Sequence, residues 1–256
     1  MIIAIVQARM GSSRLPDKVM KKVLEKPLID YLLERVSVVE KVDKIILATT
    51  TKPEDDCLAK HVASLGYDVF RGSEDDKLLR YLQTANEFNL DAVIIVDGDD
   101  LLCFPEFITN TAVALRTDKE ADVIFTQGLP LGASASGLRK DALEKVVLLK
   151  DENDTEVWGG YFTFGNNFKV KYLQAEGIFR NPNIRMTLDY SEDLIFFETI
   201  FKKLYIKNKQ FSSFDVMELL VNGQPDICDI TINAQKKYEK HILTAPRVKF
   251  KKKERI

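Results

Sequence analysis

The stretch MIIAIVQARMGSSRLPDKVM, residues 1–20, runs from an apolar segment directly into a small, basic turn. Residues 2–6 are apolar and mostly β-branched, which predicts a buried strand. Residues 8–18 then hold one Gly, two Ser, one Pro and three cationic side chains. Small residues let backbone N–H groups approach an anion, and cations neutralise its charge, so the turn predicts a phosphate-binding loop. The alternative is a solvated loop between a strand and a helix that is basic by chance.

The composition is that of a globular protein without a strong charge bias. Of the 256 residues 45% are hydrophobic, and 37 basic residues nearly balance 39 acidic ones, for a net charge of -2. This balance gives no support for nucleic-acid or membrane binding. No apolar run approaches the roughly 20 residues of a membrane span, and the apolar start is too short for a signal peptide. We therefore expect a cytoplasmic protein.

Cysteine and histidine give little support for metal or triad chemistry. The three cysteines, Cys57, Cys103 and Cys228, are widely separated and form no CxxC pair, which is typical of free thiols in a reducing compartment. His61 and His241 lie in helix-like segments far from the basic loop. We expect neither a zinc site nor a histidine-based triad.

The first half of the chain alternates between predicted strands and helices. The strands are nearly continuous apolar runs, which is typical of strands covered on both faces. This pattern favours a doubly wound, mostly parallel sheet with right-handed crossovers. The predicted strands are 2–6, 44–48, 68–70, 91–96 and 122–125, and the predicted helices are 27–39, 53–65, 74–88 and 105–116.

Three polar motifs follow predicted strands, at the edge where such sheets bind ligands. They are the basic loop, the threonines Thr49–Thr51, and Asp97-Gly98-Asp99-Asp100. Carboxylates opposite a phosphate loop suit a hard divalent cation such as Mg2+. The alternative for the aspartates is an ordinary polar turn.

The second half has a different pattern. We expect a loop over 127–137, one or two antiparallel strands within the aromatic stretch 156–170, and a strand over 184–190. Predicted helices cover 140–149, 194–204 (with Ser191 as N-cap), 213–222 and 234–242. We assign 1–245 to one domain and 246–256 to a basic tail, solvated or frayed in preference to an anion-binding arm.

Four of these motifs carry a resemblance to a known family. The loop resembles the signature loop of the CMP-sugar synthetases, cytidylyltransferases that activate acidic sugars, and is most similar to the SpsF-like proteins, which typically have QARMGSTRLPGKV. Residues 70–76 resemble VFRGSEDDVLxR, Gly98-Asp99 resembles the family's Gly-Asp pair, and 188–194 resemble LDYPEDL. The resemblance covers about residues 1–205. The chain departs from the pattern at Asp17 (usually Gly), Leu101 (usually Pro) and Phe104 (often an acidic residue).

The resemblance implies a nucleotide-diphospho-sugar transferase (GT-A-like) fold and a set of site residues. Arg9, Arg14 and Lys18 would face the β- and γ-phosphates of the nucleotide. Asp99 and Asp189 would be the first and second ligands of Mg2+. Glu192 and Asp193 would cap a helix, and Arg185 could bind an anionic group of the second substrate. Further nucleotide contacts are expected from Ala8, Gly11, Ser12, Ser13, Thr49, Arg71, Ser73 and Asp97.

The implied activity is transfer of CMP from CTP to an acidic sugar or a small acidic or phosphorylated acceptor, with release of pyrophosphate, in polysaccharide or glycoconjugate biosynthesis. Segment 127–183 would form an insertion that binds the acceptor and joins two copies into a homodimer. One alternative is a nucleotide-sugar-dependent glycosyltransferase, which has no need of the basic loop. The other is a non-catalytic nucleotide-binding relative.

Overall fold

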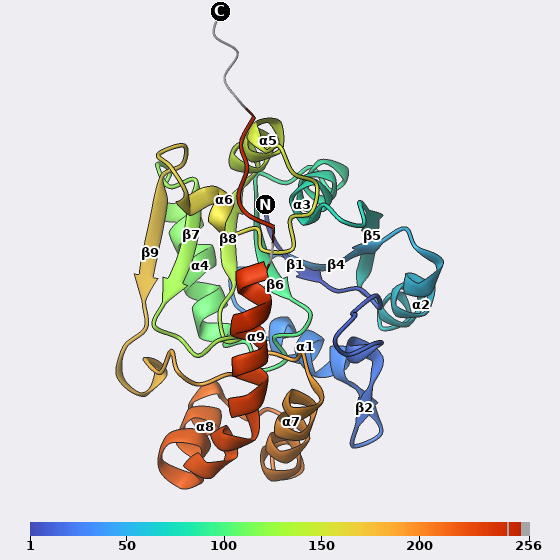
Figure 1. Cartoon of the computed structure of the whole chain (residues 1–256), viewed down its shortest axis with the longest axis vertical. Helices are drawn as coiled ribbons and strands as arrows, with labels where there is room; N and C mark the ends of the chain where they lie inside the picture. The colour runs from blue at the N-terminus through green and yellow to red at the C-terminus, as the bar shows by residue number, and fades with distance from the viewer. Residues whose placement is uncertain (245, 252–256) are drawn as a thin grey trace, which may run out of the picture.

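A seven-stranded sheet forms the centre of the computed structural model, which describes residues 1–244 and 246–251 (Figure 1). The strand order is β5-β4-β1-β6-β8-β7-β9. β1 pairs in parallel with β4 and β6, and β4 pairs in parallel with β5. β8 runs antiparallel between β6 and β7, and β7 pairs in parallel with β9. The strands are β1 (Ile2–Gln7), β4 (Lys44–Thr50), β5 (Asp68–Gly72), β6 (Ala92–Asp97), β7 (Val123–Gln127), β8 (Ser136–Arg139) and β9 (Val170–Gln174).

Helices cover both faces of this sheet (Figure 1), which confirms the predicted doubly wound α/β fold. Residues of α1, α2, α4, α7 and α8 form one hydrophobic core with one face of the sheet, and residues of α3 and α5 form a second core with the other. The helices are α1 (Leu28–Ser37), α2 (Asp56–Ser64), α3 (Lys77–Glu87), α4 (Pro105–Thr117), α5 (Lys140–Leu149), α6 (Gly160–Thr163), α7 (Ser191–Leu204), α8 (Ser213–Glu218) and α9 (Ile232–Thr244).

β1 lies at the middle of the sheet and is buried along its whole length. Its side chains alternate between the two cores, with Ala4 and Val6 in the first core and Ile3 and Ile5 in the second. Burial of each isoleucine stabilises the fold by roughly 1.5–3 kcal/mol. The segment that follows β1 is therefore fixed at the centre of the sheet's carboxyl edge.

Smaller elements connect the larger ones. A two-stranded hairpin, β2 (Lys22–Val23) and β3 (Lys26–Pro27), follows the basic loop. Of the helices in 1–244 and 246–251, none has both the length and the apolar character needed to cross a membrane. Single turns of 3-10 helix lie at Lys18–Met20, Pro53–Asp55 and Gly177–Phe179, a longer one lies at Pro225–Thr231, and a π-helical turn lies at Leu219–Gly223.

The structure corrects the predicted strands of the second half. Segment 156–170 forms turns and the short helix α6, because Trp158, Tyr161 and Phe162 are all buried in the second core instead of alternating across a strand. Residues 184–190 hold only a single β-bridge, between Leu131 and Arg185. The two strands that 127–183 does contain, β8 and β9, extend the main sheet.

The start of one helix also differs from expectation. Helix α7 begins at Ser191 with Tyr190 as its N-cap residue, one position before the predicted cap.

The C-terminal tail differs as well. Its first part is paired, since Phe250 bridges to Lys150 and the N–H of Asp151 donates to the carbonyl of Lys249 (2.8 Å). Residues 252–256 of the predicted tail lie outside the described residues.

Candidate active site

Hydrogen bonds hold the start of the basic loop against the segments that follow β6 and β4, the two strands that neighbour β1. The N–H of Gly98, just after β6, donates to the carbonyl of Gln7 (2.6 Å). A Cβ on Gly98 would lie 2.5 Å from the Cβ of Ala8, so only glycine allows this close approach. On the other side, the buried carboxylate of Asp55 accepts the N–H of Met10 (2.6 Å). The start of the loop is therefore held in one position.

The loop itself leaves backbone donors open. The Ser12 hydroxyl accepts the N–H of Leu15 (3.3 Å), which closes a tight turn. Among the described residues, no acceptor takes the N–H groups of Gly11 and Ser13. Asp17, where the family pattern has Gly, has a φ of 56°, which glycine adopts most readily. Its side chain is exposed, so its charge stays outside the loop.

Lys18 reaches from the loop to the aspartates beyond β6 and before α7. Its ammonium nitrogen lies 2.6 Å from Oδ2 of Asp99, 3.1 Å from Oδ1 of Asp189 and 2.7 Å from the carbonyl oxygen of Leu188. The lysine side chain is only 10% exposed. The structure thus brings together three predicted site residues that are far apart in the sequence.

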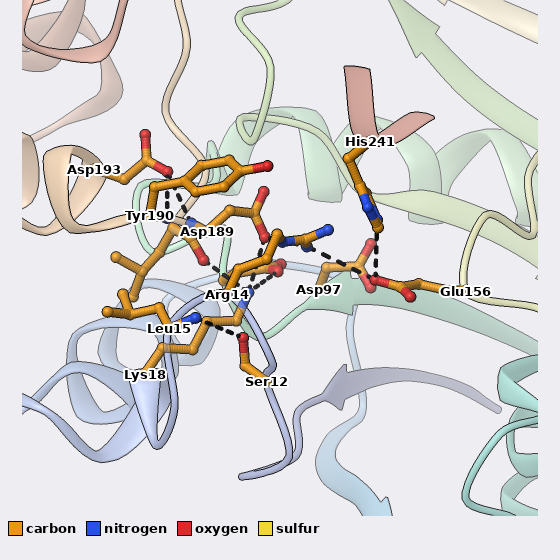
Figure 2. A network of polar contacts seen from close by, with 12 residues as sticks. Ser12, Arg14, Leu15, Lys18, Asp97, Glu156, Asp189, Tyr190, Asp193 and His241 are labelled. Atoms are coloured by element: carbon orange, nitrogen blue, oxygen red, sulfur yellow. Dashed lines mark hydrogen bonds and ion pairs between the residues drawn. The ribbon is translucent and has the colours of Figure 1, made fainter. Parts of the chain in front are cut away.

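Asp189 is the centre of this network, part of which is drawn in Figure 2. Arg14 donates to its Oδ1 (2.6 Å), and Arg185 donates to its Oδ2 (3.1 Å). Arg185 also forms a two-point ion pair with the buried Asp193 (2.8 and 2.9 Å). The Arg185 guanidinium is buried and paired with both carboxylates in this conformation, so the expectation that it binds a substrate anion stays a prediction.

Asp193 and Glu192 differ in their contacts. The Asp193 carboxylate accepts the N–H groups of Asp189 (2.8 Å) and Tyr190 (2.9 Å), which confirms the predicted helix cap. Glu192 instead pairs with Lys237 of α9 at 2.5 Å. These contacts fix the backbone that carries Asp189 relative to α7 and α9.

The electrostatics follow from this packing. Burial alone would raise the pKa of Asp189, but the cations of Lys18 and Arg14 outweigh it and hold that pKa well below its usual range. Burial lowers the pKa of Lys18, and the carboxylates of Asp99 and Asp189 more than offset this, so its pKa lies above the ordinary value. Both groups are charged at neutral pH.

The aspartates after β6 offer oxygen atoms for a divalent cation. Oδ1 of Asp97 is buried without a hydrogen-bond partner in the described part of the chain, and Lys77 Nζ lies 3.8 Å from it. Burial, followed by repulsion from Asp99, raises the pKa of Asp100, as burial does for Asp97. The unpartnered carboxylate oxygen of Asp97 fits a hard cation. Over 1–244 and 246–251, however, no group of three or more potential ligands is placed to hold a metal ion, and Lys18 lies between Asp99 and Asp189.

A cleft lies over the loop and includes residues that the sequence analysis missed. Lys77 enters it from the start of α3, and Glu156 and His241 enter it from the second half of the chain. Figure 2 shows His241 at the end of α9 pointing toward Glu156, at 3.9 Å, and Glu156 lies 3.7 Å from Arg14. The predicted residues that line this cleft are Ala8, Arg9, Gly11, Ser12, Ser13, Arg14, Lys18 and Asp99.

Three of the predicted nucleotide contacts, Thr49, Arg71 and Ser73, lie elsewhere in this conformation. Arg71 donates to the carbonyls of Thr50 (2.8 Å) and Lys52 (2.6 Å), and it lines a separate cavity together with Ser73. Thr49 is fully buried, and no partner of its hydroxyl is found within the described residues. The structure does not bring these three side chains to the cleft over the loop.

This cleft lies at the carboxyl edge of an α/β sheet, which is where proteins of this architecture bind their ligands. A family model described as cytidylyltransferase matches residues 3–223. The chain is 31% identical to the spore coat polysaccharide biosynthesis protein SpsF of Bacillus subtilis, over 88% of this chain and 95% of that protein. This chain therefore belongs to the cytidylyltransferase family and is a nucleotidyltransferase.

Solved structures share the fold. A cytidylyltransferase from Leptospira borgpetersenii superposes with a TM-score of 0.80 at 23% identity, over 89% of this chain and 96% of that one. A CMP–2-keto-3-deoxy-manno-octonic acid synthetase solved with CTP superposes with a TM-score of 0.62 at 16% identity, over 79% of this chain and 98% of that one. These likenesses confirm the architecture expected from the sequence.

Proposed function

We propose that this protein transfers CMP from CTP to the oxygen of an acidic sugar or another small acidic acceptor, with release of pyrophosphate. The observation that carries the proposal is the meeting of Arg14 and Lys18, from the loop after β1, with Asp99 and Asp189 at the carboxyl edge of the sheet. These residues place cationic groups for a triphosphate directly beside carboxylates for a divalent cation. The membership in the cytidylyltransferase family, and the CTP bound in one structural neighbour, support the choice of nucleotide.

The loop would bind the triphosphate. Its free N–H groups at Gly11 and Ser13 and the side chains of Arg9, Arg14 and Lys18 are the donors for the β- and γ-phosphates. Within residues 1–244 and 246–251, the Arg9 side chain makes only one hydrogen bond, a long one to the carbonyl of Glu74 (3.4 Å), so its charge is available to the ligand. These groups would stabilise the negative charge that grows on the departing pyrophosphate.

The chemical step is an in-line displacement at phosphorus. An acceptor oxygen forms the new bond to the α-phosphorus, the bond from that phosphorus to the bridging oxygen of pyrophosphate breaks, and the acceptor proton passes to water. The chain would orient the two reactants, and no covalent intermediate with a side chain is needed. A divalent cation, in our proposal Mg2+ held by Asp99 and Asp189 with Asp97 nearby, would supply Lewis-acid activation when bound.

The acceptor would enter from the side of segment 127–183. Glu156 of this segment lines the cleft and lies 3.7 Å from Arg14, so the segment contributes directly to the site. A cationic and hydrogen-bonding wall formed by Arg14 and His241 beside Glu156 suits an acceptor that carries both a carboxylate and hydroxyl groups. The structure supports this acceptor class and not a particular sugar.

Pyrophosphate release tests the proposal. Purified protein with Mg2+ would be offered each of the four nucleoside triphosphates with a panel of acidic sugars and phosphorylated small acids. We expect release with CTP and one acceptor, and a decrease of at least about 100-fold for Asp99→Asn. The matched control is Asp118→Asn, an aspartate at the end of α4 that pairs with Lys171 away from the cleft. Transfer from a nucleotide sugar without pyrophosphate release would instead establish a glycosyltransferase.

A further inference from the structure

Lys18 sits where a cation would have to bind. Its ammonium nitrogen has three oxygen neighbours, from Asp99, Asp189 and Leu188, at 2.6, 3.1 and 2.7 Å. The ammonium group is thus a cation surrounded by three oxygen acceptors, and the lysine side chain is almost completely buried. The two carboxylates are the same ones that the proposed function assigns to Mg2+.

We propose that Lys18 and the divalent cation compete for these carboxylates, and that nucleotide binding releases the lysine, so that the triphosphate binds before the cation. The inference rests on the proposed function, because it assumes a nucleotide at the loop. It assigns Lys18 a second task besides phosphate binding, which is to fill the cation position while no nucleotide is present.

The competition follows from the geometry. A divalent cation such as Mg2+ binds oxygen at about 2.0–2.1 Å and cannot share the position of an ammonium group that contacts the same oxygens. An ammonium group that stayed beside it would also repel it. Within the described residues, the carboxylates do not form a three-ligand metal site, which agrees with the lysine holding that position.

The release also follows from the geometry. Lys18 and Arg14 both line the cleft and both contact Asp189. An anion bound at the loop would therefore compete with the carboxylates for these two cations. A triphosphate carries more negative charge than Asp99 and Asp189 together, and it also receives the free N–H groups of Gly11 and Ser13. Asp189 keeps its contact with Arg185 when the other two cations leave, so its position is maintained.

The test measures Mn2+ binding by electron paramagnetic resonance, with no acceptor present. We expect ligand-free wild-type protein to bind Mn2+ weakly, and Lys18→Met protein to bind it at least tenfold more tightly without any nucleotide. The matched control is Lys22→Met, an exposed lysine of β2 that should bind Mn2+ as the wild type does. Adding Asp99→Asn to Lys18→Met should abolish the gain, which locates the ion.

A second measurement keeps the inference testable if Lys18→Met does not fold. Wild-type protein in EDTA should bind CTP, detected by calorimetry, because the loop cations bind the triphosphate without a metal. CTP binding that requires Mn2+, or a folded Lys18→Met variant with wild-type Mn2+ affinity, would overturn the inference. Neither outcome affects the proposed function, whose own failure would be the absence of pyrophosphate release with CTP and every acceptor.

Discussion

At the scale of single residues, the buried carboxylate of Asp189 depends on three cationic neighbours. Its side chain is 4% exposed and contacts Arg14, Lys18 and Arg185. Loss of one partner from such a buried ionic cluster costs about 3–5 kcal/mol. We therefore expect Asp189→Asn to lower the free energy of unfolding by about that amount at pH 7, measured by urea denaturation.

The pH dependence of that difference follows from the lowered pKa of Asp189. The unfolded chain protonates this carboxyl near pH 4, whereas the folded protein keeps it ionised to lower pH. Its stabilising contribution is thus fully present above about pH 4 and decreases as the pH falls toward the folded-state pKa. The gap in unfolding free energy between wild type and Asp189→Asn should shrink across this range. Parallel curves would show that Asp189 is not ionised in the folded protein.

Asp17 provides a second prediction at this scale, about backbone strain. A φ of 56° disfavours β-branched residues and is tolerated by Asp and Gly. We expect Asp17→Val to lower the free energy of unfolding by about 1–2 kcal/mol, and Asp17→Gly to change it by less than about 1 kcal/mol. Equal effects of both substitutions in thermal unfolding would mean that the loop relaxes around this position.

At the scale of elements, the connection between β4 and α2 positions the basic loop. Asp55 accepts the N–H groups of Met10 (2.6 Å) and Thr50 (3.2 Å) from a buried site. Asp55→Ala leaves these donors unpaired, so we expect a loss of about 2–3 kcal/mol in unfolding free energy and weaker CTP binding by calorimetry. The neighbouring Asp56 makes a surface ion pair with Arg71, so Asp56→Ala should cost less than about 1 kcal/mol. Equal losses in both variants would contradict the anchoring role.

The sheet could be predicted from sequence because β1, β4 and β6 are continuous apolar runs that turn polar at one edge. The conformation of segment 156–170 could not be predicted in this way. Its aromatic residues fit a strand as well as a helix or turn, and only their packing in the second core decides between them. A similar limit applies to the cations of the loop. The sequence predicts that Lys18 faces an anion. It does not show that Lys18 contacts Asp99 and Asp189, which lie 81 and 171 positions away along the chain.

At the scale of the whole molecule, the cleft is assembled from both ends of the chain. Helix α9 runs from the side of α8 back toward the sheet (Figure 1). Near its end, His241 lies 3.9 Å from Glu156 in the cleft over the N-terminal loop (Figure 2). His241 is far from the motifs along the sequence but lies beside them in space, because separation along the chain does not predict which distant segments pack together. The second half of the chain therefore completes the site that the first twenty residues begin.

The predicted homodimer is also a property of the whole molecule. If segment 127–183 joins two copies, its exposed apolar side chains should lie in the interface, and Phe164 is 66% exposed there. This residue follows α6 and precedes β9, which is one of the two edge strands of the sheet and offers unpaired backbone groups to a second copy. We expect sedimentation equilibrium to give about twice the chain mass of 29.2 kDa, and Phe164→Asp to give the monomer.

Ile206 is the matched control for this substitution, because it is also 66% exposed but follows α7, outside the segment. Ile206→Asp should leave the dimer intact, since a charge on a free surface costs little. Dissociation by Ile206→Asp alone would place the interface near α7 instead, and a monomeric wild type would contradict the dimer itself. Because Glu156 reaches the cleft from the same segment as Phe164, dissociation should also weaken acceptor binding more than CTP binding.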